Sequence, residues 1–415
     1  MSQHKTKIGL ACAGGAIEGA AYEVGVLNAL EESLDGIHFD DLDIYVGVSA
    51  GAFITACLAN SITPATLARG FISKSSKVMQ VTPETFFKPA LTEYWERFER
   101  LPKLVSEAVW NYITHPLDLT LEGALYPLTS LLPVGIFSND HLREYLERNF
   151  STEGRTDDFH HLKKELRIIA TDLESSEVVH FGEPPFDDIP ISKAVQASTA
   201  LPVLYTPVNI NGNYYIDGVA RRTVHASVAL EEGAQLVFCI NPIVPVDTKS
   251  IENHSNSHDI RELGLTAVLS QTFRTMIHSR MLTGFKNYEY RYPDADFIII
   301  EPSVTDTRLF FTNIFSFQDR KEVCEYGYQS TRRQLLKHYG KLSQILSKYQ
   351  IRINRDVLTD TGKTLYETEA GRNGFSIKTA LKKTDEVLSH LDDLLKDLEA
   401  PLSVNNRHKK VLDSD

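Results

Sequence analysis

The feature that most limits how this chain can fold is a pattern that occurs twice in its first 60 residues. Each copy consists of a short apolar strand, a glycine-containing turn and a helix. The strands are expected at 7–13 and 43–49, and the helices at 20–34 and 50–61. Alternation at such short spacing predicts parallel strands joined by crossover helices. The sequence therefore favours an α/β fold.

The second turn carries the sequence Gly47-Val48-Ser49-Ala50-Gly51. A serine hydroxyl becomes a useful nucleophile when it is exposed, lies beside a base and faces donors that stabilise an oxyanion. A tight Gly-x-Ser-x-Gly turn between a strand and a helix presents the hydroxyl in this way, next to the positive end of the helix dipole. In the alternative interpretation, Ser49 only caps the following helix.

The first turn contains Gly14 and Gly15, again between a strand and a helix. Consecutive backbone N–H groups in such a turn can point at an anion. The turn lacks the Gly-Lys-Ser/Thr of a nucleotide-binding P-loop, and it does not form a complete GxGxxG dinucleotide motif. An oxyanion hole is therefore the preferred interpretation.

A third motif, Asp217-Gly218, comes 168 residues after Ser49, at the end of a short predicted strand. A carboxylate in this position would emerge at a turn. Taken alone, Asp-Gly is more often an ordinary turn. It gains weight here from the two motifs that precede it.

Together the three motifs resemble the patatin-like phospholipase family over about Lys7 to Pro242. The corresponding blocks are the glycine-rich loop Gly14-Gly15-Ala16, the nucleophile elbow around Ser49, and Asp217-Gly218-Val219. The segments IIATDLESSEVVHF and AVQASTALPVLYTPV also look like the family's connecting segments. Two positions depart from the pattern: Glu18 stands where many members carry Arg, and Val219 stands where Gly or Ala is usual.

The resemblance implies a three-layer fold with a mostly parallel central sheet flanked by helices, a helical cap insertion and C-terminal helices. It implies a serine lipid acyl hydrolase of the phospholipase A or lysophospholipase type, with no cofactor and no metal. Ser49 and Asp217 would form a catalytic dyad that works through an acyl-enzyme. The loop of Gly14, Gly15 and Ala16 would form the oxyanion hole.

Alternatives to this dyad and to this function stay open. A Ser–His–Asp triad would need one of the later histidines, which are His225, His254, His258 and His278. The chain could also be a catalytically silent scaffold that binds a partner, or a soluble esterase or thioesterase.

The domain organisation predicted from the sequence is a hydrolase domain over 1–353, a polar linker over 354–375, and an amphipathic helix with a tail over 376–415. An aromatic-rich cap is expected at 64–133, either as a lipid-docking surface or as an ordinary helical insertion. The leucine-rich heptad pattern of the last helix suits a homodimer or docking on its own domain.

Composition limits the partners and the location of the protein. The net charge of -12 argues against nucleic-acid binding, which requires a basic surface. No signal peptide and no apolar run of membrane-spanning length is visible. The four scattered cysteines have no metal-binding spacing and are expected to be reduced and mostly buried. We expect a cytoplasmic protein that acts on a phospholipid or another acyl-ester lipid, with peripheral membrane contact through the cap.

Overall fold

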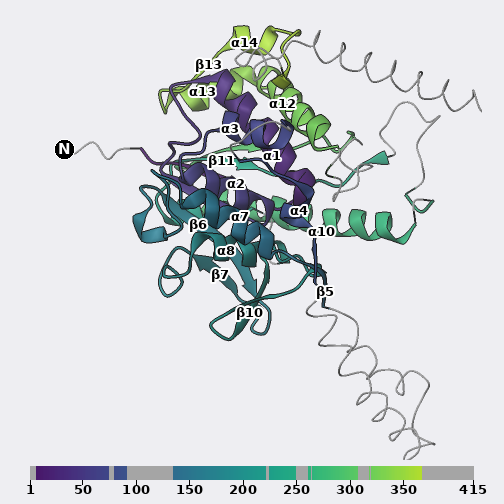
Figure 1. Cartoon of the computed structure of the whole chain (residues 1–415). Helices are drawn as coiled ribbons and strands as arrows, with labels where there is room; N and C mark the ends of the chain where they lie inside the picture. The colour runs from purple at the N-terminus through teal and green to yellow at the C-terminus, as the bar shows by residue number, and fades with distance from the viewer. Residues whose placement is uncertain are drawn as a thin grey trace, which may run out of the picture. The chain divides into compact units, whose positions relative to one another are not determined.

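The computed structural model divides into two units, Met1–Gly362 and Lys363–Asp415. It describes residues 6–73, 79–90, 134–220, 224–248, 260–262, 264–306, 317 and 319–366 (Figure 1). Most of the predicted cap and the whole predicted C-terminal helix therefore lie outside the described residues. Residues 355–359, predicted as part of the linker, form the short helix α14 (Arg355–Thr359).

The first unit is built on a mostly parallel sheet, as the sequence predicts. In spatial order its strands are β12 (Asp296–Ile300), β11 (Leu236–Ile240), β1 (Ile8–Cys12), β3 (Ile44–Val48), β6 (Glu165–Asp172), β10 (Asn213–Asp217) and β9 (Val208–Ile210). Pairing is parallel from β12 to β6. Antiparallel strands β10 and β7 (Val178–Phe181) both pair with β6.

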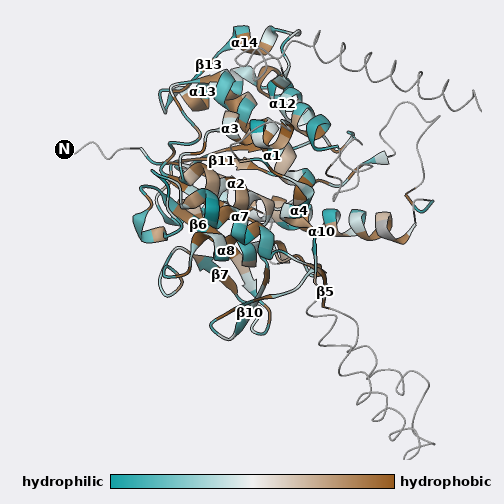
Figure 2. Cartoon of the chain, in the orientation of Figure 1, coloured by the Kyte–Doolittle hydropathy of each residue, from teal (hydrophilic) through white to brown (hydrophobic). Residues whose placement is uncertain are grey.

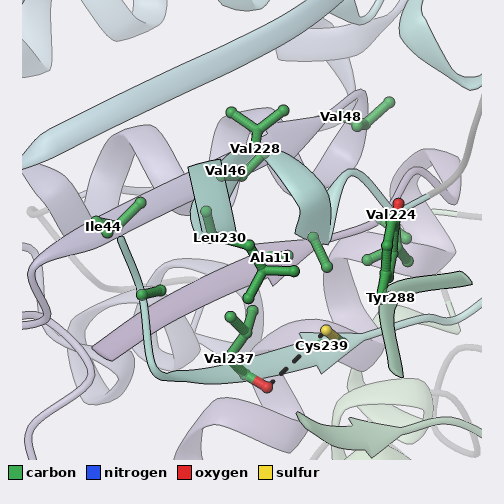
Figure 3. Close-up of a cluster of buried hydrophobic side chains, with 14 of the residues drawn as sticks. Ala11, Ile44, Val46, Val48, Val224, Val228, Leu230, Val237, Cys239 and Tyr288 are labelled. Atoms are coloured by element: carbon green, nitrogen blue, oxygen red, sulfur yellow. Dashed lines mark hydrogen bonds between the residues drawn. The ribbon is translucent and has the colours of Figure 1, made fainter. Parts of the chain in front are cut away.

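The central strands are buried on both faces, which explains why their sequences are continuously apolar. Every residue of β3 and β11 is buried. On one face, Ala11, Val46 and Val237 pack with side chains of the helices α9 (Ala226–Glu231) and α10 (Leu265–Arg291) (Figure 3). This packing forms two of the three expected layers.

Helices on the opposite face form the third layer. Helix α2 (Ala50–Ala59) contacts β1, β3 and β6, and α8 (Ile191–Ser198) contacts β6. Helix α1 (Ala16–Ser33) contacts α2, α3 (Pro64–Ile72) and α12 (Arg320–Lys337). The short helix α13 (Tyr339–Ser347) follows α12.

A small second sheet joins a segment of the predicted cap to two segments that follow the cap in sequence. Strand β5 (Gly135–Ser138) pairs with β4 (Lys88–Pro89) and with β8 (Val203–Tyr205). Beside this sheet, α4 (Pro83–Phe86) contacts α7 (Asp140–Phe150). A third, two-stranded sheet pairs β2 (Leu34–Asp35) with β13 (Arg352–Ile353).

Two sequence-based expectations can be checked directly against the structure. All four cysteines are buried and free, which confirms their interpretation as buried thiols. Among the described residues, no helix combines the length and the apolar character that crossing a membrane requires.

Helices α1 and α12 approach each other closely because each presents a glycine at the contact. A Cβ added to Gly25 would lie 2.0 Å from the carbonyl oxygen of Cys324, and one added to Gly327 would lie 2.5 Å from that of Tyr22. Both neighbours are backbone atoms, which cannot move aside without shifting a whole helix.

We therefore expect Gly25→Ala to lower the free energy of unfolding by about 3 kcal/mol, because overpacking outweighs the better helix propensity of alanine. Gly284→Ala in α10 is the matched control. Its Cβ would lie 3.8 Å from the nearest atom, the Tyr288 hydroxyl oxygen, so it should stabilise the protein by about 0.5 kcal/mol. Urea unfolding of both variants checks the prediction, and equal stabilities would contradict it.

Candidate active site

Three neighbouring strands bring Ser49 and Asp217 together, although they are far apart in sequence. Ser49 directly follows Val48, which pairs with Ile169 of β6. Asp217 pairs with Ala170, the next residue of β6, from the antiparallel strand β10. The register of these strands therefore places the serine and the aspartate side by side, at the level where β3 ends.

Ser49 adopts a backbone conformation that residues other than glycine rarely adopt. Its φ is 53° and its ψ is -120°, at the junction of β3 and α2. The flanking glycines allow this turn. A Cβ on Gly47 would lie 2.1 Å from the Thr55 Oγ1, and one on Gly51 would lie 2.3 Å from the carbonyl oxygen of Cys12. The turn thus has the strand–turn–helix context that the sequence predicts.

A residue that the sequence did not single out holds the backbone of this turn. The Ser49 backbone N–H donates a hydrogen bond to the Ser198 Oγ at 2.8 Å. The Ser198 hydroxyl in turn donates to the carbonyl oxygen of Ile169 at 2.6 Å. Ser198 lies at the end of α8 and is fully buried. Nothing in its local sequence distinguishes it from an ordinary helix residue.

Asp217 is buried and its carboxylate faces the elbow. The backbone N–H of Val219 donates to the Asp217 Oδ1 at 2.9 Å, and the Ser49 side chain lies close enough to the same carboxyl group to lower its pKa. Burial raises the pKa of Asp217 from 3.8 to about 7, although Ser49 and the Val219 N–H both lower it. A Cβ on Gly218 would lie 2.5 Å from the carbonyl oxygen of Ile169, so only glycine fits there.

The glycine loop also passes close to Ser49. A Cβ on Gly14 would lie 3.1 Å from the Ser49 Cβ and 3.6 Å from its Oγ. Gly15 precedes α1 and packs against Gly19 and Pro242, and Ala16 starts the helix with a φ of 52°. The loop and the N-terminus of α1 thus lie beside the nucleophile candidate, where an oxyanion hole would have to be.

Glu18 is buried in the first turn of α1. Burial lowers the pKa of Arg274 in α10, and the charge of Glu18 raises it.

Ser49 opens into a narrow, mostly apolar cavity of about 40 Å³. By this measure the cavity has room for roughly three water molecules. The residues that line it are Ala16, Ile17, Ala20, Ser49, Ala50, Phe53, Phe86, Leu142, Thr199, Leu201, Leu204 and Tyr205. They come from α1, α2, α4, α7, the end of α8 and β8. Of these elements, β8 is a strand of the small sheet, and α4 belongs to the predicted cap.

A larger cavity of about 420 Å³ lies elsewhere, lined by residues of β7, α9 and α10 that include His180, His225 and Arg280. The His225 ring packs against the His180 ring with centroids 6.5 Å apart. His278 lies 3.4 Å from Glu301. His254 and His258 lie outside the described residues. In the described part of the chain, no group of His, Cys, Asp or Glu side chains could hold a metal ion.

Comparisons with known proteins bear on this site. The family model described as patatin-like phospholipase matches residues 10–230, which include all three motifs. No curated protein matches the sequence.

Among solved structures, VipD from Legionella pneumophila is 17% identical over 80% of this chain and 67% of its own, with a TM-score of 0.34. The type III effector ExoU is 12% identical over 98% of this chain and 67% of its own, also with a TM-score of 0.34. Human GIVD cytosolic phospholipase A2 is 12% identical over 80% of this chain and 58% of its own, with a TM-score of 0.30. The match of the family model over more than half of the sequence is the decisive finding: the chain belongs to the patatin-like phospholipase family.

Proposed function

We propose that the protein is a serine lipid acyl hydrolase of the phospholipase A or lysophospholipase type. Membership of the patatin-like phospholipase family supports lipid acyl hydrolysis in general. The observation that carries the specific proposal is the approach of the Ser49 side chain to the buried Asp217 carboxyl group, whose pKa it lowers, beside an apolar cavity. Ser49 acts as the nucleophile and Asp217 as the proton acceptor.

In the proposed reaction, Asp217 accepts the hydroxyl proton as the Ser49 Oγ attacks the ester carbonyl carbon. The negative charge that develops on the carbonyl oxygen is stabilised by backbone N–H groups of the loop Gly14-Gly15-Ala16, next to the N-terminus of α1. The leaving alcohol takes the proton from Asp217, and the acyl group stays on Ser49. Water then attacks the acyl-enzyme by the same route and releases the fatty acid.

The environment of Asp217 suits this role. A carboxylate with an ordinary pKa is a weak base toward an alcohol. Burial raises the pKa of Asp217 to about 7, so the carboxylate is a stronger base and remains ionised above neutral pH. Ser198 contributes by holding the Ser49 backbone N–H, and we regard it as a positioning residue.

The cavity supports an apolar acyl chain as the substrate group that is recognised. Phe53, Phe86 and Leu204 are among its lining residues. Because the cavity is only about 40 Å³, an acyl chain can enter only when lining side chains separate. The predicted lipid contact through the cap and the predicted homodimer remain proposals, since most of the cap and the whole C-terminal helix lie outside the described parts of the chain.

The dyad makes a prediction about histidines. Replacing His225, His254, His258 or His278 singly with alanine should change kcat/KM by no more than about threefold, because general-base catalysis through histidine would account for at least 100-fold. Steady-state rates with a short-chain ester check this, with thermal unfolding measured in parallel to identify misfolded variants. A 100-fold loss in one well-folded variant would establish a triad instead.

Two other functions fit this scaffold. A catalytically silent protein would bind a partner without cleaving esters, and a soluble esterase or thioesterase would use the same residues on a substrate outside a lipid assembly. Incubation with a mixed lipid extract, followed by mass spectrometry, separates the three, with Ser49→Ala as the control. We expect free fatty acid and lysolipid from the wild type alone. Hydrolysis of short-chain esters without lipid products would indicate the soluble esterase.

A further inference from the structure

Helix α10 is the longest described helix of the chain and has two different faces. One face packs on the sheet through Met281, Phe285 and Tyr288, which belong to the core of the domain. The opposite face is exposed. Part of α10 stands clear of the other labelled helices in Figure 1.

The exposed face is apolar over the first three turns of the helix. Its large apolar side chains and their exposed fractions are Leu265 (73%), Val268 (39%), Leu269 (45%), Phe273 (59%) and Met276 (48%). Spacings of three and four residues put them on one side of the helix. Single exposed apolar residues are common on protein surfaces, but a contiguous group such as this one marks an interaction site. In Figure 2, several segments of α10 are brown, the colour of hydrophobic residues.

The same helix is basic, although the chain as a whole is acidic. Helix α10 contains four arginine or lysine residues and one glutamate, whereas the whole chain has a net charge of -12. Arg280, Lys286 and Arg291 are exposed and follow the apolar turns along the helix. An apolar group next to a cluster of cations is complementary to an anionic lipid surface, whose acyl region is apolar and whose headgroups carry negative charge.

Hydrogen bonds attach this helix to the edge of the candidate active site. The Gln271 side chain accepts from the Val246 backbone N–H at 3.1 Å and donates to the Val246 carbonyl at 2.7 Å. Arg274 donates to the carbonyl oxygen of Val244 at 3.3 Å. The chain just before them, at Pro242, packs against Gly15 and Gly19 of the glycine loop and α1.

We propose that the exposed face of α10, comprising Leu265, Val268, Leu269, Phe273, Met276, Arg280, Lys286 and Arg291, docks the protein onto an anionic lipid bilayer. The apolar turns enter the boundary between headgroups and acyl chains, and the cations contact headgroup phosphates. This inference rests on the proposed function, because it assigns the bilayer as the source of the lipid substrate. The segment from Pro242 to Val246 connects the docking helix to the loop that would stabilise the oxyanion.

The experiment measures binding of the Ser49→Ala protein to vesicles, so that hydrolysis plays no part. The test variant adds Leu269→Glu and Met276→Glu to the docking face. The matched control adds Leu173→Glu and Leu336→Glu, which have similar exposed fractions of 44% and 38% and introduce the same charge elsewhere. Thermal unfolding of both proteins establishes that they are folded.

Co-sedimentation uses phosphatidylcholine vesicles with about 30% phosphatidylglycerol, to which the surface should bind through both charge and apolar insertion. We expect the test variant to partition about tenfold more weakly than the parent, and the control to stay within about twofold of it. Raising the salt concentration should weaken binding of the parent, because screening reduces the contribution of the cations.

Equal binding of the test variant and the parent would overturn the proposal. So would a control that loses as much binding as the test variant. Light scattering provides a further check: a dimer of the parent that the test variant breaks, with vesicle binding unchanged, would assign the face to a second copy of the chain. Vesicle binding without lipid hydrolysis by the wild-type protein would contradict the proposed function and leave the docking surface intact.

Discussion

Ser49→Ala should reduce kcat for ester hydrolysis by about 10⁴-fold or more, because removing a nucleophile that acts as one unit with its base removes the covalent route. Folding should be preserved, since the hydroxyl of a buried serine leaves only a small space. The Ser49 backbone N–H would still bond to the Ser198 Oγ, as it does in the wild type.

A fluorophosphonate probe gives the measurement that accompanies the rates. It should label the wild type at Ser49 and leave Ser49→Ala unlabelled, as shown by intact-mass analysis and peptide mapping. Ser192→Ala, which removes another buried serine hydroxyl, should retain both labelling and turnover. Persistent turnover in purified Ser49→Ala would contradict the assignment of the nucleophile.

Asp217→Asn should lower kcat by roughly 10³-fold, because the amide cannot accept the Ser49 proton. In the wild type, kcat/KM should rise with pH, reach half of its maximum near pH 7, and level off above this pH as the Asp217 carboxyl group, with its pKa of about 7, becomes ionised. The pH dependence of kcat/KM for a soluble ester checks this result. A profile that is flat between pH 5 and 8 would show that the base is a group other than Asp217.

The same pKa shift affects stability, with a definite sign. The pKa of Asp217 is higher in the folded protein than in the unfolded chain, so folding favours its protonated form. Its favourable contribution is complete below about pH 4 and is lost as the pH rises through about 7. The wild type should therefore lose on the order of 4 kcal/mol relative to Asp217→Asn between these limits, as measured by urea unfolding.

The sequence predicted the central fold well because its strongest signals are local. The strands at 7–13 and 43–49 correspond to β1 and β3, and both glycine turns lie between a strand and a helix, as expected. Parallel strands that are buried on both faces must be apolar throughout, so their sequences report their environment directly. The antiparallel pairing of β10 with β6, in contrast, depends on contacts that no local pattern records.

Several features of the site depend on residues that are distant in sequence. Ser198 looks like any small helix residue until α8 packs beside β6 and the Ser198 hydroxyl reaches the Ser49 backbone. Glu18 departs from the family pattern, and only the fold shows that it is buried and that its charge acts on Arg274 of α10. The apolar pattern of α10 likewise predicts a helix but does not tell which of its two faces is buried.

By itself, the sequence determined that a serine occupies a tight turn between strand and helix, because Gly47 and Gly51 are the residues that such a turn requires. It also identified Asp217 as the candidate partner of Ser49. Only the tertiary structure decided that the two side chains lie close together. It also decided that the carboxyl group is buried deeply enough to have a pKa of about 7. The physical reason is that turn conformation is set by neighbouring residues, whereas burial and long-range hydrogen bonds arise only when β3, β6 and β10 assemble.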